Sequence, residues 1–278
     1  MSTSKVVSQL PAPADFFAQP SGKQGLSIDF EKKVVVVTGG NRGLGRGIVE
    51  ALAQANASVA MIYNSAKDAD EVAAELRKKW SLPIRAYQCN VSDAARVKEV
   101  FGTIEKEMGE ITGVVANSGI SVVKPALELG KEDFDKVFGV NVFGVFNTCQ
   151  AAAALWTERK HAGSIVVISS MSDTIVNSPI QQAFYNASKG GVSNLSRCLA
   201  AEWAPYGIRV NNVNPGFIET DQTMHMNAEL RENQCKEVPL GRFSKTYEQA
   251  GQVVYLLSKY SSYQTGSSVY IDGGYLMW

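Results

Sequence analysis

Residues 34–45 have the sequence VVVVTGGNRGLG, and this stretch decides the fold class. A run of valines is typical of a strand buried on both faces, as in a parallel sheet that helices cover on both sides. The glycines that follow allow a tight turn and a close approach of the backbone to a ligand. From Leu44 onward the sequence has helix-forming character. The order strand, glycine-rich turn, helix predicts a phosphate-binding βαβ unit, although the loop by itself also fits an ordinary strand-to-helix turn.

The rest of the chain repeats this alternation of short β-branched runs and longer helical stretches, which is the pattern of βαβ units. The expected strands are Val34–Thr38, Val59–Tyr63, Arg85–Cys89, Val114–Asn117, Ser164–Ser169, Arg209–Asn214 and Ser268–Ile271. The expected helices span residues 44–56, 67–80, 93–109, 131–160, 184–204 and 246–260. We therefore predict an α/β fold of the Rossmann type, a doubly wound parallel sheet of seven strands with helices on both faces.

The composition of the 278-residue chain is that of a globular protein with one core. Hydrophobic residues make up 45%, charged residues 19%, and acids and bases cancel, which argues against a disordered or nucleic-acid-binding chain. No apolar run approaches the roughly 20 residues that cross a bilayer, and the chain does not start like a signal peptide. We expect a cytoplasmic protein without nucleic-acid or membrane partners, in which residues 1–32 form a flexible N-terminal arm and residues 33–278 a single domain.

The cysteines are too widely separated for a metal or redox site. They stand at Cys89, Cys149, Cys198 and Cys235, so neither a zinc ribbon nor a CxxC pair is available. We expect reduced structural thiols and no metal site.

The end of the second expected strand indicates which dinucleotide the glycine loop would bind. NAD-selective sites place an acid there to hydrogen-bond the ribose hydroxyls, but this strand ends in Tyr63-Asn64-Ser65. A carboxylate would repel a 2′-phosphate, whereas Asn64 and Ser65 can donate hydrogen bonds to it and Arg42 can add a charge-assisted contact. We therefore predict NADP(H) rather than NAD(H). The other interpretation of Arg42 is a solvated loop cation.

Tyr185 and Lys189 are four residues apart, which on a helix brings both side chains to one face. A free tyrosine has a pKa of about 10, so only about one in a thousand is phenolate at neutral pH. An adjacent ammonium favours the phenolate, and a nicotinamide cation would favour it further, so we expect a lowered Tyr185 pKa. This spacing alone occurs by chance in many helices.

Ser170 follows the fifth expected strand, at the edge where open α/β sheets bind ligands. Its hydroxyl is therefore placed to hold a substrate oxygen beside Tyr185. A serine hydrolase would need a histidine base, but His161 and His225 lie in polar stretches and are expected to face solvent. Together, these residues favour hydride transfer between a nicotinamide and a carbonyl or alcohol, with Tyr185 as the acid/base.

Along residues 33–278 the chain resembles the short-chain dehydrogenases/reductases. The shared motifs are TGxxxGxG at residues 38–45, NxG at 117–119, Asn141 in VNVFGVF, Ser170, YxxxK at 185–189, NPG at 214–216 and IDGG at 271–274. Two positions depart from the usual pattern, since Ser118 stands where the family commonly has Ala and Asn90 where it commonly has Asp. Neither departure removes a catalytic group.

The resemblance implies the roles of the site residues. Asn141, Ser170, Tyr185 and Lys189 would form the catalytic tetrad, in which Lys189 also binds the nicotinamide ribose and Asn141 anchors a water. The expected cofactor contacts are Gly39, Asn41, Arg42, Gly43, Leu44, Gly45, Asn64, Ser65, Asn90, Val91, Asn117, Gly119, Tyr185, Lys189, Pro215, Gly216, Ile218 and Thr220.

Within this family, stretches such as ISVVKPALEL, TDQTMHM and IDGGYLMW resemble the fungal NADP-dependent mannitol 2-dehydrogenases. The resemblance implies a homotetramer that interconverts D-fructose and D-mannitol. A broader carbonyl, sorbose or xylulose reductase is the alternative, and a non-catalytic NADP-binding regulator is disfavoured because all four tetrad groups are present. Helices 131–160 and 184–204 are apolar enough to carry oligomer contacts.

Further residues near the expected site fit a polyol. Hydroxyl-binding candidates are Ser172, Asn177, Gln181, Gln182 and Asn186, although each also fits a loop or helix-cap role. We expect packing roles for Met171, Phe184 and Trp203. The segment Glu219–Pro239 is the expected substrate lid.

Overall fold

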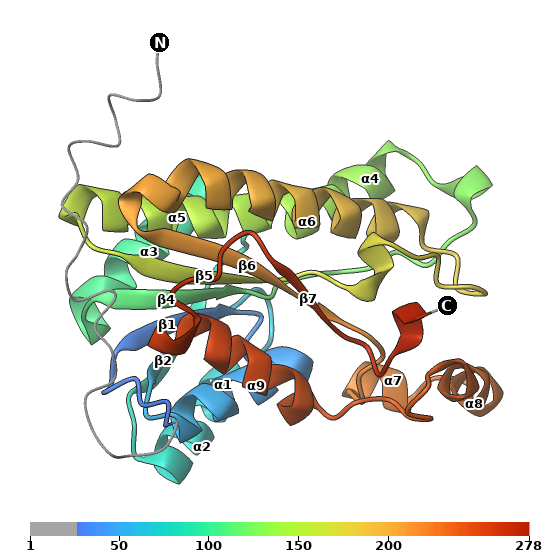
Figure 1. Cartoon of the computed structure of the whole chain (residues 1–278), viewed down its shortest axis with the longest axis horizontal. Coiled ribbons are helices and arrows are strands. Elements are labelled where there is room, and N and C mark those ends of the chain that lie inside the picture. The colour runs from blue at the N-terminus through green and yellow to red at the C-terminus, as the bar shows by residue number, and fades with distance from the viewer. Residues whose placement is uncertain (1–26, 278) are drawn as a thin grey trace.

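The computed structural model of the protein describes residues 27–277, and its centre is one parallel sheet of seven strands (Figure 1). The strands are β1 (Val34–Thr38), β2 (Ser58–Tyr63), β3 (Ile84–Gln88), β4 (Ile111–Ala116), β5 (Gly163–Ile168), β6 (Ile208–Pro215) and β7 (Ser268–Ile271). Their order across the sheet is β3-β2-β1-β4-β5-β6-β7, and every neighbouring pair is parallel. The predicted fold class is thus confirmed.

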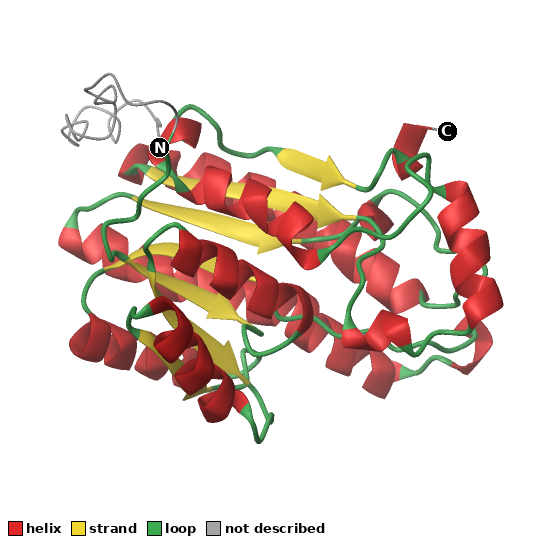
Figure 2. Ribbon diagram, turned by 90° about the horizontal axis from the view of Figure 1, so that it is seen from below, coloured by secondary structure: helices red, strands yellow, loops and turns green. Residues whose placement is uncertain are grey.

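Helices cover both faces of the sheet, as predicted. One face carries α1 (Gly43–Gln54), α2 (Ala69–Trp80) and α9 (Thr246–Leu257), and the other carries α3 (Ala94–Met108), α4 (Lys131–Phe138), α5 (Val145–Arg159) and α6 (Ala183–Trp203). All strand arrows point the same way in Figure 2, so the carboxyl ends of the strands share one edge of the sheet. This edge is where open α/β sheets bind ligands.

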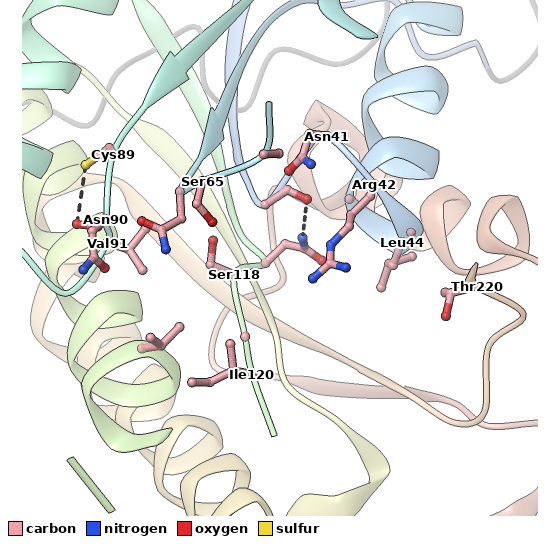
Figure 3. Close-up of a pocket in the computed structure, with 18 of the residues that line it drawn as sticks. Asn41, Arg42, Leu44, Ser65, Cys89, Asn90, Val91, Ser118, Ile120 and Thr220 are labelled. Carbon is pink, nitrogen blue, oxygen red and sulfur yellow. Dashed lines mark hydrogen bonds between the residues drawn. The ribbon is translucent and has the colours of Figure 1, made fainter. Parts of the chain in front are cut away.

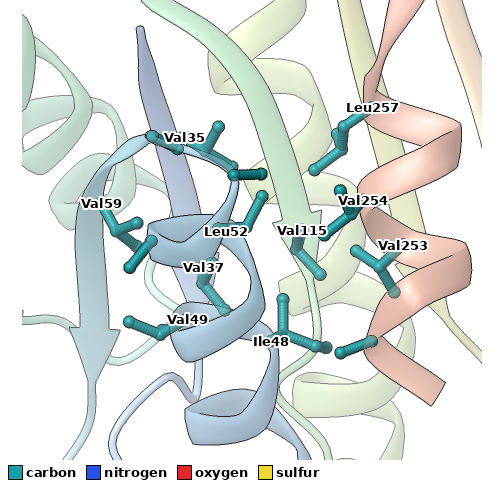
Figure 4. Packing of buried hydrophobic residues seen from close by; sticks show 14 of the residues in the cluster. Val35, Val37, Ile48, Val49, Leu52, Val59, Val115, Val253, Val254 and Leu257 are labelled. Atoms are coloured by element: carbon teal, nitrogen blue, oxygen red, sulfur yellow. The ribbon is translucent and has the colours of Figure 1, made fainter. Parts of the chain in front are cut away.

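The four valines of β1 explain why a continuous apolar run forms this strand. Side chains alternate across a strand, so Val35 and Val37 face one layer of helices and Val34 and Val36 the other. All four are buried. Val35 and Val37 pack with residues of α1 and α9, as Figure 4 shows.

The expected helix over 131–160 is not one continuous α-helix. A π-helical turn, Gly139–Gly144, separates α4 from α5. Asn141 lies in this turn, and its side-chain amide exchanges two hydrogen bonds with the backbone of Ile120, so a long-range contact accompanies the break. The predicted helix over 131–160 is confirmed as the continuous helical segment Lys131–Arg159, and the π-helical turn inside it was not predicted because the apolar pattern continues through it.

Lys131–Arg159 is long and apolar enough to cross a membrane by composition, with a mean hydropathy of 1.3 in its most apolar window. Half of that window is buried inside the fold. Its buried residues, such as Val145 and Trp156, pack with residues of α3 and α6 in the core on that face of the sheet. The segment is therefore a core helix.

The sequence did not predict two short helices beyond the end of β6. They are α7 (Asp221–Met224) and α8 (Ala228–Glu237), within the expected lid segment Glu219–Pro239. Glu219 pairs with Arg231 at 2.8 Å and with Lys245, which ties α8 and the start of the segment to the residues that lead into α9.

Residues 1–26 of the expected N-terminal arm lie outside the described residues. The arm's last residues, 27–32, contact the folded domain. Phe30 is buried in the core beside α1, and the backbone of Phe30 and Lys32 donates to the carbonyls of Ala55 and Asn56 at 2.9 and 2.8 Å. The packed part of the chain therefore begins before residue 33.

Candidate active site and cofactor cleft

A cleft of about 780 Å³ opens at the carboxyl ends of β1, β2, β3 and β4 (Figure 3). Most of its lining residues come directly after these four strands, and Thr220 and Asp221 come from the segment after β6. Of the expected cofactor contacts, it is lined by Gly39, Asn41, Arg42, Gly43, Leu44, Gly45, Asn64, Ser65, Asn90, Val91, Asn117, Gly119 and Thr220. Segments distant in sequence thus form one continuous wall.

The glycine loop turns the backbone so that the start of α1 faces this cleft. Gly39 and Gly43 have φ values of +65° and +52°, a region that side chains disfavour. A Cβ on Gly45 would lie 2.0 Å from the Gly39 carbonyl oxygen, so only glycine fits there. No side chain caps the first turn of α1, and no acid stands in it. Its free N–H groups and the positive end of its dipole suit a phosphate group.

Thr38 and Asn117 lock the glycine loop onto β4. Asn117 donates through Nδ2 to the carbonyl of Thr38 at 2.9 Å, while the Thr38 hydroxyl accepts from the backbone N–H groups of Asn117 and Ser118 at 2.9 and 3.0 Å. Asn117 lines the cleft, but its side-chain amide is hydrogen-bonded to the glycine loop and stabilises the conformation of that loop.

Arg42, Asn64 and Ser65 lie with exposed side chains at the part of the cleft beside β2. No carboxylate stands at positions 64 or 65, which fits a 2′-phosphate. Asp68 also lines the cleft, and the sequence did not single it out. It stands at the N-cap position of α2 without a side-chain capping bond.

Several other lining residues were not predicted. They are Ala66, Cys89, Ser118, Ile120, Val140 and Asp221. Ser118 and Ile120 are the neighbours of the predicted contact Gly119, so the NxG motif could have indicated that they also line the cleft. No motif in the sequence marked Val140, which lies in the π-helical turn next to Asn141.

The expected nicotinamide contacts follow β6. Pro215 ends the strand, and a Cβ on Gly216 would lie 2.6 Å from the Cα atom of Asp272, so glycine allows the close approach to the end of β7. Ile218 forms an isolated bridge with Ser244. Thr220 lies beside Gly43 of the glycine loop, since its Cγ2 is 3.6 Å from the Cβ position of that glycine. The segment therefore reaches across to the phosphate end of the cleft.

The structure brings together the four residues of the expected tetrad. Ser170 follows β5, Tyr185 and Lys189 share one face of α6, and Asn141 lies in the π-helical turn. Lys189 Nζ is 5.6 Å from the centroid of the Tyr185 ring and donates to the carbonyl of Ile168 at 2.9 Å. The Ser170 hydroxyl is oriented by Ser172, with 3.0 Å between the two Oγ atoms.

Gly119 borders both the cleft and this tetrad. A Cβ there would lie 3.6 Å from Asn141 Oδ1 and 3.7 Å from Lys189 Nζ. The Asn141 side chain is fully committed, because it accepts from the Ile120 N–H at 2.8 Å and donates to the Ile120 carbonyl and to Ser188 Oγ. Anchoring of a water by Asn141 stays a prediction.

Burial sets the protonation of the two ionisable tetrad groups. It raises the pKa of Tyr185, and a hydrogen bond with Ser170 acts in the opposite direction without overcoming it. Burial lowers the pKa of Lys189 to about 8, opposed by the charge of Asp173. For the protein groups alone, the expected lowering of the Tyr185 pKa is therefore wrong, because desolvation of the phenolate is the largest effect on it. The phenol is held protonated, which is the form that donates to a carbonyl.

Three of the five polyol-binding candidates, Asn177, Gln182 and Asn186, are hydrogen-bonded to one another between the loop after β5 and the start of α6. Asn177 is buried, and its Oδ1 accepts from Gln182 Nε2 at 3.0 Å and Asn186 Nδ2 at 2.9 Å. The backbone of Gln181 binds Lys124. These side chains therefore shape the loop beside Ser170, and Ser172 is the one that touches a tetrad residue.

The remaining predictions concern packing and metals. Met171 is buried, Phe184 packs edge-on against Phe134 and Phe138, and Trp203 packs on the core, as expected. His161 is half-buried beside Trp156 and Glu110, contrary to its expected exposure, whereas His225 is exposed. Among residues 27–277 no group of three or more potential metal ligands occurs, and all four cysteines are free thiols.

Comparison with known proteins gives consistent matches over the described fold. A family model described as Enoyl-(Acyl carrier protein) reductase matches residues 39–276. A sorbose reductase of Candida albicans is 40% identical over 245 residues, 87% of this chain and 86% of that protein. An NADP-dependent mannitol dehydrogenase of Alternaria alternata is 36% identical over 246 residues, 87% and 92% of the two chains. The crystal structure of an NADPH-dependent 3-quinuclidinone reductase from Rhodotorula rubra has a TM-score of 0.86 and 32% identity, and covers 96% of this chain and all of that one.

Proposed function

Because this chain belongs to the short-chain dehydrogenase/reductase family of oxidoreductases, we propose that it interconverts a ketose and a sugar alcohol with NADP(H), and that D-fructose and D-mannitol are the pair. The observation that carries this proposal is the grouping of Ser170, Tyr185 and Lys189 beside the cleft that the glycine loop borders. A bound NADP(H) would supply or accept the hydride. The protein would supply the proton and hold the substrate.

The geometry gives each group a task in ketose reduction. Ser170 would hold the carbonyl oxygen, and Tyr185 would donate its phenolic proton to that oxygen. The Lys189 ammonium lies close enough to stabilise the phenolate that remains. In the oxidation of the alcohol the proton would move in the reverse direction.

The choice of NADP(H) rests on the end of the cleft beside β2. The loop after β2 carries Asn64 and Ser65 without a carboxylate, and the exposed guanidinium of Arg42 borders the same cleft. These groups can donate to a 2′-phosphate. Two of the similar proteins described above are named NADP- or NADPH-dependent, which supports the same choice.

Replacing Arg42 with alanine is expected to weaken NADPH binding by about 10- to 100-fold, because a charged hydrogen bond to phosphate is lost. NADH, which lacks the 2′-phosphate, should lose little. Fluorescence titration of both dinucleotides measures the two dissociation constants. Arg46→Ala is the matched control, since Arg46 also lies on the first turns of α1 but pairs with Glu75 at 2.9 Å. Equal losses for NADPH and NADH in the Arg42 variant would remove this residue from the phosphate site.

Sorbose is the second candidate substrate, because a sorbose reductase is more similar to this chain than the mannitol dehydrogenase described above. Less hydroxylated ketones are the third candidate substrates, because the structure is also similar to that of a 3-quinuclidinone reductase. Ser172 favours a polyol, because it places a second hydroxyl group beside Ser170.

The substrate is tested by following NADPH oxidation with D-fructose, L-sorbose, D-xylulose and a simple aryl ketone. We expect kcat/KM to be highest for fructose, and the reverse reaction to reduce NADP in the presence of mannitol. A higher value for sorbose would replace the fructose assignment, and a preference for the aryl ketone would reject the sugar substrates. If none of these carbonyl compounds is reduced, the proposed ketose reductase activity is wrong.

We also propose that the protein is a homotetramer of the cytoplasm, in which residues 33–278 act as one catalytic domain and Glu219–Pro239 as the substrate lid. Phe134 and Phe143, on the segment 131–159, leave 41% and 50% of their surface exposed and are available for contacts with another chain. A second copy of the chain is the expected partner of this face. Sedimentation of the purified protein measures the oligomeric state.

A further inference from the structure

Asp173 holds together four elements behind the tetrad. It ends the short 3-10 turn η5 (Met171–Asp173), which begins directly after Ser170. Its Oδ2 accepts hydrogen bonds from Ser193 Oγ at 2.6 Å and from Asn214 Nδ2 at 2.8 Å. The Tyr270 hydroxyl donates to Oδ1 at 3.1 Å. One half-buried carboxylate therefore joins η5 to α6, β6 and β7.

The first of these bonds leads to Ser170. Asn214 Nδ2 donates to Asp173 and also to the backbone carbonyl of Ser170 at 3.1 Å. Asn214 is fully buried, so its amide has no solvent to replace a lost partner. The carboxylate of Asp173 thus fixes the orientation of the amide that holds the Ser170 backbone.

The second bond leads to Lys189. Ser193 Oγ, which donates to Asp173, lies 2.8 Å from Ser169 Oγ. The single hydroxyl hydrogen of Ser169 can be donated either to Ser193 Oγ or to the backbone carbonyl of Lys189 at 3.2 Å. Asp173, Ser193 and Ser169 thus form a chain of hydroxyl contacts from η5 to the turn of α6 that carries Lys189.

The charge of Asp173 acts on Lys189 as well. Burial lowers the pKa of Lys189 to about 8, and Asp173 raises it against that effect. The other titratable or charged groups around these two residues are Tyr185 and Arg197 on α6 and Tyr270 on β7. The strand β5 and the turn 139–144 contribute uncharged residues. Asp173 is therefore the carboxylate that favours the ammonium form of Lys189.

We propose that Asp173 is a positioning residue for the reaction, whose carboxylate fixes the backbone at Ser170 and Lys189 and maintains the positive charge of Lys189. The proposal rests on the proposed function, because that function gives Ser170 and Lys189 their tasks. It adds a fifth side chain that acts through the tetrad and needs no contact with substrate or cofactor.

The test replaces Asp173 with asparagine, which keeps the size of the side chain and removes its charge. We expect kcat for ketose reduction to fall by about 10- to 100-fold, the loss typical of a small misplacement of reacting groups. KM for the ketose and the dissociation constant of NADPH should stay near the wild-type values. Reduction needs the Lys189 ammonium, so its rate falls as pH rises through the Lys189 pKa. Without the Asp173 charge this fall should move to lower pH, because Asp173 raises the Lys189 pKa.

Two further variants separate charge from packing. Asp173→Glu restores the charge and should recover the wild-type position of the alkaline fall. Tyr270→Phe removes one hydrogen bond to Asp173 while keeping the carboxylate, so its alkaline fall should stay in place. A kcat and pH profile of Asp173→Asn that match the wild type would overturn the proposal, as would an alkaline fall that moves equally in Tyr270→Phe.

Amide hydrogen exchange keeps this proposal separate from the proposed function, because it needs no turnover. Asp173→Asn should accelerate exchange in the segments around Ser170 and Lys189 relative to the rest of α6 and the sheet. This result supports the positioning role even if the wild-type protein reduces none of the ketoses. Unchanged exchange in both segments counts against it, whatever the activity of the wild type.

Discussion

Replacing Tyr185 with phenylalanine is expected to lower kcat by about 10³-fold, within the range that general acid–base groups contribute. The change removes one oxygen atom and keeps the ring that lies 5.6 Å from Lys189 Nζ. In reduction the carbonyl oxygen then has no proton donor held beside Ser170, and the Lys189 ammonium has no phenolate to stabilise. NADPH binding should change little, because the cleft beside β1 and β2 is untouched.

Steady-state kinetics and NADPH titration of the same preparation measure both expectations. Tyr206→Phe is a matched control, since it removes a hydroxyl from an exposed tyrosine just after α6 and should leave kcat unchanged. If Tyr185→Phe keeps near-normal turnover, the proton comes from another group and the acid/base assignment is wrong. If it loses NADPH binding together with turnover, the phenol acts in cofactor binding instead.

Most of the sheet could be predicted from the sequence because a buried parallel strand is a continuous apolar run bounded by loop residues. The bounds of β1 and β7 agree with the prediction, whereas β4 begins at Ile111, three residues before the predicted start. Thr112 and Gly113 interrupt the apolar run there. Gly113 pairs with both β1 and β5, and Thr112 lies at a register shift beside it, so this part of the strand is set by its neighbours in the sheet.

Among the features that the sequence did not predict are the π-helical turn Gly139–Gly144 and the helix α8. The π-helical turn is accompanied by hydrogen bonds between Asn141 and Ile120, which are 21 residues apart. The helix α8 has a polar sequence with few apolar positions, so its periodicity is weak and it was expected only as part of a lid.

The residues of the site also fall into a group that the sequence identified and a group that needed the structure. Motif spacing identified the glycine loop that lines the cleft and the pair Tyr185 and Lys189, which lies behind the lining residue Gly119. Asp173 carries no motif, since its partners Asn214 and Tyr270 are 41 and 97 residues away. The direction of the Tyr185 pKa also required the structure, because burial is a property of the folded surroundings and outweighs the hydrogen bond with Ser170.

Gly45 is the position of the loop where a single methyl group should have the largest effect on cofactor binding. A Cβ there would lie 2.0 Å from the Gly39 carbonyl oxygen and 2.7 Å from Asn117 Nδ2. Neither neighbour is the free end of a flexible chain, because Gly39 is backbone and the Asn117 amide is bonded to Thr38 at 2.9 Å. The glycine loop must therefore move as a whole to accept the methyl group.

Gly45→Ala is consequently expected to weaken NADPH binding by about 100-fold or more, since the start of α1 no longer faces the phosphates in its original position. Gly102→Ala is the matched control, because Gly102 lies within α3 and a Cβ there meets no atom within 4 Å. That control should leave binding unchanged and raise the free energy of unfolding by about 0.5–1 kcal/mol. NADPH titration and denaturant unfolding of both variants separate lost binding from lost folding. A Gly45→Ala protein that folds and binds NADPH like the wild type would mean that the close contact between α1 and Gly39 does not shape the phosphate site.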